Sequence, residues 1–206
     1  MPDPQSGVVE APDEALVELA RAGDADAREE LFRRGREVAY RVAFRLLGNA
    51  EDAMDAVQDG FIKAFRNLDA FDGRSAFRTW LLRIVTNAAH DLGRRKRRRP
   101  ALRLADLDAD SGGSSGGMPG SSVAEPSVDD DPSRGLHRDD LRRALDEALS
   151  RLSPTIRETF VLFAEAELSY KEIADAQQVP IGTVMSRLYY ARQKLQAALE
   201  EIEEHP

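Results

Sequence analysis

The chain has 206 residues, 42% of them hydrophobic, which suffices for one or two small domains but not for one large core. It contains no cysteine, which excludes disulfides, thiolate metal sites and cysteine nucleophiles. No apolar run approaches the roughly 18 residues of a membrane span, and the polar N-terminus does not resemble a signal peptide. We therefore expect a soluble, cytoplasmic protein.

The formal net charge of −8 is unevenly distributed. Residues 1–103 carry +2 (19 basic, 17 acidic), residues 104–131 carry −7 (seven acidic, none basic) and residues 132–206 carry −3 (10 basic, 13 acidic). Positive charge gathers in the run 94–99 and in the segment 180–194. Because the local field decides whether a protein binds DNA, the overall acidity does not argue against nucleic acid.

The N-terminal half is predicted to be helical. Residues 1–12 are polar and expected to be disordered, whereas apolar residues recur at helical spacing over residues 13–49. Gly23 divides this stretch into a short and a long helix, and Gly48 with Asn49 ends the long one. A third helix is predicted over residues 51–68 and, after a loop at Asp72, a fourth over residues 75–98, which Pro100 ends.

Residues 104–131 are acidic and rich in glycine and serine, and a structureless stretch of this length is improbable inside one compact domain. We predict a flexible acidic linker over residues 101–135 between two domains, residues 13–100 and 136–206. The expected fold is all-α: two small helical domains joined by this linker.

Local signals place the helices of the second domain. Leucines line one face of its first helix, at Leu141, Leu145, Leu149 and Leu152. Ser153 before a proline is a helix start, and Ser169 with Glu172 predicts a capping box that opens a short helix ending near Gln177. The last helix is predicted over residues 181–201. A short helix, a tight turn and a longer basic helix form a helix-turn-helix.

Two faces are predicted on the third helix. The apolar stripe consists of Met54, Val57, Phe61 and Phe65. A separate acidic face carries Asp52, Asp55 and Asp59, with Gln58 at its boundary. Three interpretations of this face are open. It is an ordinary solvated surface or a surface for a basic partner. The third is a divalent-metal site, because carboxylates three and seven residues apart share a helix face. Gly60 costs about 1 kcal/mol relative to alanine inside a helix, and the sequence offers no reason for it.

The fourth helix and the loop before it carry residue types that bind DNA. Arginines that reach phosphates are Arg74, Arg78 and Arg83, and residues that hydrogen-bond base edges are Ser75 and Asn87. Phe71, Phe77 and Trp80 stack on bases or lie in the core with Leu81, Ile84 and Val85. A run of six adjacent bases follows, whose like charges repel one another: Arg94, Arg95, Lys96, Arg97, Arg98 and Arg99. This repulsion favours the interpretation that the run binds a polyanion over the alternative of a solvated helix end.

The last helix is predicted to be amphipathic. Its core positions are Val184, Leu188, Ala191 and Leu195, and the positions between them are Thr183, Ser186, Arg187, Tyr189, Tyr190, Arg192 and Lys194. The alternatives are a surface helix and insertion into DNA. Arg187 is the best candidate for a base or phosphate contact, because its planar fork binds bidentately.

Residues 51–61, 71–87 and 152–195, in this order, resemble the extracytoplasmic-function sigma factors, the smallest members of the sigma-70 family. The resemblance covers residues 13–100 and 136–200. It implies a promoter-specificity subunit of bacterial RNA polymerase, which is not itself an enzyme and needs no cofactor or metal. It also implies an anti-sigma factor as a partner, and a linker that threads through the polymerase towards its active centre and RNA exit path.

The resemblance also implies roles for individual residues. Asp52, Asp55, Gln58 and Asp59 match the surface that binds the clamp helices of the largest polymerase subunit. Arg74, Ser75, Phe77, Trp80 and Asn87 match the part that melts the minus-ten element and captures a flipped base, and the last helix matches the reader of the minus-thirty-five element. Met54, Ala56, Met185 and Tyr190 depart from residues common in the family.

Two other classes of function compete with this interpretation. A stand-alone helix-turn-helix regulator would bind duplex DNA without polymerase and would use residues 13–100 as a sensor or dimerisation domain. A metal-dependent hydrolase would use Asp52, Asp55 and Asp59, but the three histidines, at positions 90, 137 and 205, have no ligand spacing.

Overall fold

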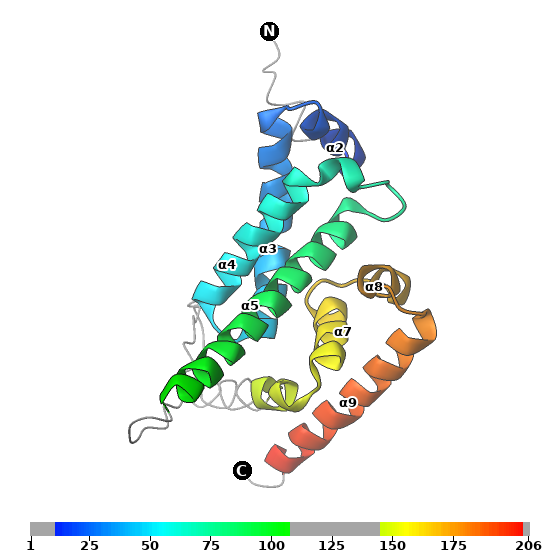
Figure 1. Cartoon of the computed structure of the whole chain (residues 1–206). Coiled ribbons are helices and arrows are strands. Elements are labelled where there is room, and N and C mark those ends of the chain that lie inside the picture. The colour runs from blue at the N-terminus through cyan, green and yellow to red at the C-terminus, as the bar shows by residue number, and fades with distance from the viewer. Residues whose placement is uncertain (1–10, 108–144, 204–206) are drawn as a thin grey trace, which may run out of the picture. The chain divides into compact units, whose positions relative to one another are not determined.

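The computed structural model describes residues 11–107 and 145–203, and every regular element in these two stretches is a helix (Figure 1). The chain divides into two compact units, Met1–Ser121 and Ser122–Pro206. We refer to their described parts as the N-terminal domain, residues 11–107, and the C-terminal domain, residues 145–203. The predicted all-α fold with two helical domains is confirmed.

Four α-helices and one short 3-10 helix form the N-terminal domain. They are α2 (Asp13–Arg21), α3 (Ala25–Leu47), α4 (Ala50–Arg66), η1 (Leu68–Ala70) and α5 (Phe77–Leu107). Gly23 and Gly48 adopt positive φ angles of 97° and 77°, which favour glycine, and they separate the helices where the sequence predicts. The side chains of Asp24 and Asn49 then cap α3 and α4.

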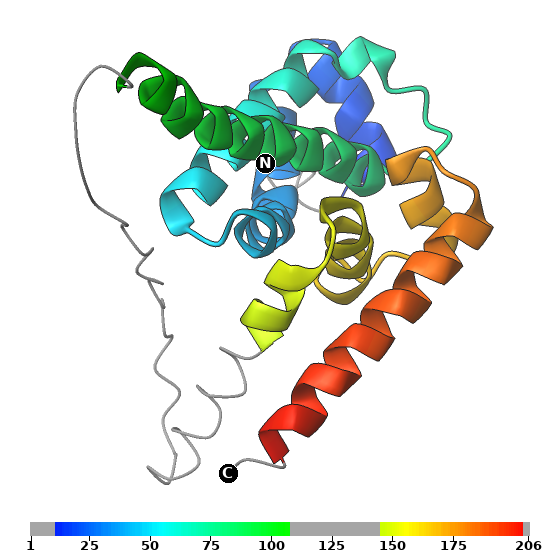
Figure 2. The same cartoon turned by 60° about the horizontal axis from the view of Figure 1, so that its bottom comes forward.

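Helices α3, α4 and α5 pack side by side, and both views of the structure show α5 running along the other two (Figures 1 and 2). The core between them is aliphatic, with Leu31, Val42, Leu81, Leu82 and Val85 all buried. Burial of side chains of this size contributes about 1.5–3 kcal/mol each, so this shared core holds the three helices in place.

Gly60 of α4 lies directly against Val85 of α5. A Cβ at Gly60 would be 2.7 Å from Cγ2 and 3.2 Å from Cα of Val85 on α5. The close approach therefore requires the residue without a side chain, which explains a helical glycine for which the sequence offers no reason.

The buried carboxylate of Glu30 ties α3 together and links it to α2. It accepts hydrogen bonds from Arg33, at 2.7 Å to each oxygen, and from Arg34, at 2.6 Å. Arg34 also donates to Asp13 of α2 at 2.8 Å. The hydrogen bonds from the two arginines outweigh the effect of burial and lower the pKa of Glu30 from 4.5 to about 2.

We expect acid to weaken the N-terminal domain in part through Glu30. Because its pKa is about 2 in the folded state and 4.5 ordinarily, its contribution is complete above pH 4.5 and is lost as the pH falls to 2. Trp80 is the only tryptophan, so its fluorescence follows urea unfolding of this domain. Glu30→Gln should flatten the fall in unfolding free energy between pH 4.5 and 2. An unchanged slope would contradict this assignment.

Several predicted boundaries are wrong. Helix α5 does not end before Pro100 but continues to Leu107, so residues 101–107, predicted as linker, are helical. A proline removes one hydrogen bond from a helix, and the Arg, Ala and Leu residues around it are good helix formers. Helix α4 ends at Arg66, two residues before its predicted end at residue 68, and η1 follows it. The predicted disorder at 1–10 and linker at 108–135 lie outside the described residues.

The C-terminal domain comprises a helical segment at residues 145–151, α7 (Pro154–Ala164), α8 (Tyr170–Gln177) and α9 (Ile181–Glu203). Leu149 and Leu152 pack against Ala191 and Leu195 of α9, as the leucine stripe predicts, with Leu145 half-buried beside them. Leu141 lies outside the described residues. Ser153 precedes α7 as predicted, but its hydroxyl makes no capping hydrogen bond.

The predicted helix-turn-helix is present in α8 and α9. Ser169 and Glu172 form the capping box: the Ser169 Oγ accepts from the amide of Glu172, and the Glu172 carboxylate accepts from the amide of Ser169 at 2.9 Å. Gln178 then adopts the left-handed conformation, with φ 55°, and turns the chain into α9. The capping box thus fixes the start of α8, and the left-handed Gln178 ends α8 and begins the turn to α9.

Candidate functional site

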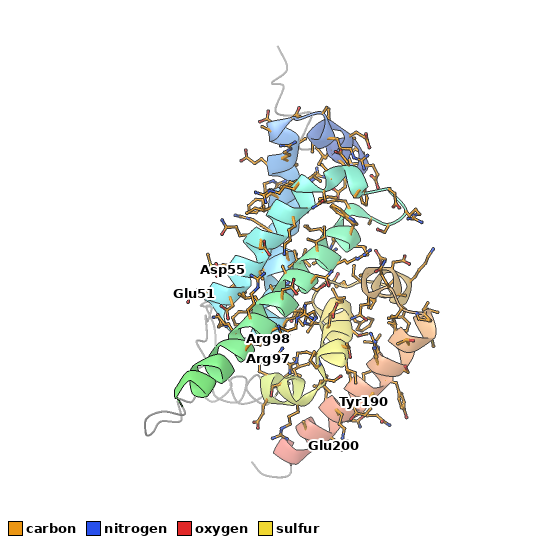
Figure 3. The ribbon with its side chains drawn as sticks, in the orientation of Figure 1. Glu51, Asp55, Arg97, Arg98, Tyr190 and Glu200 are labelled. Atoms are coloured by element: carbon orange, nitrogen blue, oxygen red, sulfur yellow. The ribbon has the colours of Figure 1, made fainter. Side chains whose placement is uncertain are left out.

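The acidic face of α4 is partly as predicted. Asp55, Gln58 and Asp59 are exposed, and Glu51 lies beside them on the first turn. Figure 3 shows Glu51 and Asp55 near the N-terminal end of α4. Asp59 pairs with Lys63 at 2.7 Å, whereas within the described residues no ion pair involves Asp55. The face therefore offers at least one carboxylate that is free for a basic partner.

Asp52 does not belong to this exposed face, although the helical periodicity places it there. It is only 4% exposed, and Lys96 of α5 forms an ion pair with its Oδ1. The other oxygen accepts a hydrogen bond from Asn49 Nδ2 at 2.7 Å. Burial disfavours the charged carboxylate, but the hydrogen bonds from Lys96 and Asn49 prevail and lower the pKa of Asp52.

The aromatic residues of the predicted minus-ten segment form a cluster. The ring centres of Phe71, Phe77 and Trp80 lie 5.4–5.9 Å apart. Phe77 is 4% exposed and Phe71 5% exposed, so the prediction that Phe77 contacts bases is wrong: with Leu81 one turn later, it belongs to the core. Of the three, only Trp80 is half-buried and retains accessible surface.

The polar residues of this segment lie on the surface. Arg74, Arg78 and Asn87 are exposed, and Ser75 and Arg83 are half-buried. Arg74 is paired with Asp72, which also accepts the Arg74 amide at 3.1 Å, and these hydrogen bonds lower the pKa of Asp72. Arg74 therefore meets a phosphate only in competition with this carboxylate.

A cavity of about 290 Å³ adjoins Arg78. Two arginines of α3, Arg34 and Arg41, line it together with Glu37 and Val38. The sequence interpretation does not include these α3 residues. Their spacing of seven residues puts them on one helix face, but nothing in the sequence indicates that α5 brings Arg78 to the same place.

The basic run of α5 is exposed at every position from 94 to 98. Arg94 pairs with Asp91 and Lys96 with Asp52. Arg95, Arg97 and Arg98 make no ion pair within the part of the chain that the structure describes, and Figure 3 shows the last two on α5. No described carboxylate neutralises these three arginines, which makes this part of α5 suited to phosphates. The side chain of Arg99 lies outside the described residues.

Helix α9 has the two predicted faces. Its buried side packs into the domain through Val184, Leu188, Ala191 and Leu195. Exposed side chains are Ser186, Tyr189, Tyr190, Arg192 and Lys194, and Thr183 and Arg187 are half-buried. Ile181 and Met185 add exposed apolar surface at the N-terminal end of the helix, where a base methyl group can be contacted.

Two contacts inside the domain restrain the arginines of α9. Arg187 Nη1 donates to Gln177 Oε1 at 3.0 Å, and the hydroxyl of the buried Thr159 lies 2.8 Å from the same oxygen. Arg192 lies over the ring of Phe163, with its central carbon 5.3 Å from the ring centre. Restrained arginines lose less conformational entropy on binding than free ones.

Neither a metal centre nor a membrane segment is found in residues 11–107 and 145–203. No group of three or more His, Asp or Glu side chains there could hold a metal ion. In the same stretches, no helix combines the length and apolar character that a membrane span needs.

Comparison with known proteins identifies relatives of both domains. The family model of Sigma-70 region 2 matches residues 31–99, and that of Sigma-70 region 4 matches residues 142–195. The chain is 32% identical over 191 residues to the RNA polymerase sigma-H factor of Pseudomonas aeruginosa, covering 92% of this chain and 95% of that protein. It is 32% identical over 187 residues to the extracytoplasmic-function sigma factor SigW of Bacillus subtilis, covering 90% and 96%.

Solved structures have the same fold. CnrH in complex with the cytosolic domain of CnrY aligns with a TM-score of 0.64 and 28% identity, covering 92% of this chain and 97% of that one. The sigma factor RpoE of Bartonella quintana, in complex with the anti-sigma factor NepR, aligns with a TM-score of 0.58 and 24% identity, covering 84% and 96%. The chain therefore belongs to the sigma-70 family, among the RNA polymerase sigma factors of the extracytoplasmic-function type.

Proposed function

We propose that this sigma factor binds core RNA polymerase through the exposed face of α4 and contacts promoter DNA with α5 and α9. The observation that carries the proposal is the separation of charge within the N-terminal domain. Asp55, Gln58 and Asp59 present an acidic face on α4, while Arg95, Arg97 and Arg98 are exposed bases on α5. One small domain thus has one surface suited to a basic protein and another suited to a polyanion.

The DNA-contacting residues follow from exposure. On α5, Arg78 and Asn87 are exposed to a melted strand, while Arg83, Trp80 and, in the preceding loop, Ser75 are half-buried. An asparagine amide offers a donor and an acceptor to a flipped base, and an indole ring that is not fully buried offers a surface on which a base can stack. The buried ring of Phe77 packs against Trp80 and thereby holds the indole in place.

Upstream DNA is contacted by α9. Its exposed N-terminal half enters the major groove, as the second helix of a helix-turn-helix does, and Arg187 contacts a base or a phosphate. The catalytic chemistry belongs to the polymerase, and the protein acts in the cytoplasm, where polymerase and promoter meet. The complex of its relative CnrH with the cytosolic domain of CnrY supports control by a partner protein, which we propose to be an anti-sigma factor.

The proposed function is tested by titrating fluorescently labelled protein with core RNA polymerase, without DNA and with a second sigma factor as competitor. Tight, competitive binding is expected. Failure to bind polymerase, together with unaided binding to duplex DNA, would favour the stand-alone helix-turn-helix regulator instead.

Arg187→Ala is expected to weaken promoter binding by the holoenzyme by about 1–3 kcal/mol if the side chain contacts a base. Gln177→Ala should have a smaller effect, because it leaves the guanidinium in place but frees it to move. The measurement is promoter affinity at fixed salt. Arg151→Ala removes the same charge from an exposed position outside α8 and α9 and is the matched control. Equal effects of Arg187→Ala and Arg151→Ala would show that only net charge matters.

A further inference from the structure

One ion pair connects the two charged regions of the N-terminal domain. The carboxylate of Asp52 on α4 pairs through Oδ1 with Lys96 Nζ on α5, 44 positions away along the chain. Its Oδ2 accepts a hydrogen bond from Asn49 Nδ2 at 2.7 Å, and Asn49 Oδ1 in turn caps α4 by accepting from the amide of Asp52 at 2.8 Å. Both carboxylate oxygens are thus engaged inside the domain.

The exposure of Asp52 sets it apart from its neighbours. Glu51 and Asp55, on either side of it, are exposed, whereas the side chain of Asp52 is 6% exposed. A buried carboxylate has lost its hydration and depends on its partners to remain charged. To contact another protein, Asp52 would have to give up Lys96, so it cannot be a polymerase contact in this arrangement.

Lys96 is exposed, and its ion pair distinguishes it from the arginines at positions 95, 97 and 98. Arg95, Arg97 and Arg98 make no ion pair within the described residues, whereas the ammonium of Lys96 is already neutralised by Asp52. A base that is paired within the protein adds little when a phosphate approaches, because it has no free charge to neutralise it.

The position of the pair gives it a structural consequence. It joins α5 to the α3–α4 turn, where Gly93 of α5 also lies close to Leu47: a Cβ there would be 3.7 Å from Leu47 Cδ2. Figure 3 shows Arg97 and Arg98 on α5, with Glu51 and Asp55 on the adjoining end of α4. Along the chain, Asp52 lies between Glu51 and Asp55, and Lys96 lies between Arg95 and Arg97, so the pair joins the helix turns that carry the two charged regions.

We propose that Asp52 and Lys96 are positioning residues, an internal ion pair that holds the basic run of α5 at a fixed place against α4. They contact neither polymerase nor DNA. The consequence for DNA binding rests on the proposed function, whereas the pair itself does not. When this part of α5 is held in place, Arg95, Arg97 and Arg98 keep constant positions relative to the rest of the domain as they meet phosphates.

The pair is tested in the free protein by a double-mutant cycle, with urea unfolding followed by Trp80 fluorescence. Asp52→Asn and Lys96→Met should each lower the unfolding midpoint, and the double variant should lose less than the sum of the two. Asp52→Asn combined with Arg95→Met is the matched control and should be additive. Additivity of Asp52→Asn with Lys96→Met would overturn the proposal.

Lys96→Met alone provides a second measurement should Asp52→Asn fail to fold, because Lys96 is largely exposed. Loss of the ammonium should raise the pKa of the Asp52 carboxyl, which carbon NMR of the side chain can follow. An Asp52 pKa that does not change would show that the two groups do not interact in solution.

The consequence for DNA is tested by the salt dependence of promoter binding by the holoenzyme. Arg95→Met should reduce the slope of log affinity against log salt by about 0.9, the value for one phosphate contact. Lys96→Met should lower affinity several-fold at every salt concentration and leave the slope unchanged. A slope reduced as much as in Arg95→Met would make Lys96 a phosphate contact and overturn its positioning role. If the unaltered holoenzyme shows no promoter binding, the proposed function fails, while the cycle in the free protein still decides the pair.

Discussion

Asp55→Arg is expected to abolish binding of the protein to core RNA polymerase while leaving its fold intact. Asp55 is exposed on α4, and no ion pair within the described residues depends on it. An arginine there would place like charges together at the proposed interface with a basic partner, which costs several kcal/mol. We expect the Kd to rise at least about 100-fold, equivalent to about 3 kcal/mol.

The measurement is the competitive titration with core polymerase, accompanied by urea unfolding through Trp80 fluorescence. Asp69→Arg reverses the same charge at an exposed position of the same domain, in η1, and should bind as the unaltered protein does. Retained binding by Asp55→Arg would contradict the proposal that the acidic face of α4 binds polymerase. Equal loss in both variants would attribute binding to the net charge of the domain.

Gly60→Val is expected to have the largest effect on stability, a loss of about 3 kcal/mol. A Cβ at Gly60 would be 2.7 Å from Val85 Cγ2 and 3.2 Å from Val85 Cα, and the Cα cannot rotate away. Helices α4 and α5 would have to separate, and overpacking of this kind costs about 1–3 kcal/mol or more. For Gly60→Ala, we expect this cost to exceed the roughly 1 kcal/mol that alanine gains over glycine in a helix.

Urea unfolding followed by Trp80 fluorescence measures this loss. The matched control is Gly93→Ala, in α5, where a Cβ would have its nearest neighbours at 3.7 Å, an ordinary contact distance. This variant should gain about 0.5–1 kcal/mol from helix propensity. Stabilisation by Gly60→Ala to the same degree would show that the two helices can move apart at little cost.

The parts of the fold that depend on neighbours along the chain could be predicted. Gly23 and Gly48 end helices because positive φ angles favour glycine, and Ser169 and Glu172 form a capping box because both lie within one helical turn. The buried side of α9 follows its apolar spacing for the same reason. The end of α5 could not be predicted from Pro100, because a proline weakens a helix without always ending it.

For the candidate site too, properties set by one helix could be predicted, whereas properties set by contacts between helices could not. The sequence by itself determined that α4 has an acidic face, that α5 carries a basic run and that α9 is amphipathic, because each property follows from the side chains along one helix. Only the tertiary structure decided which members of each set remain accessible. Asp52 is paired with Lys96, Phe77 lies in the core, and Gly60 is required by Val85. Helical periodicity gives the direction of a side chain, but contacts between helices decide what it meets there.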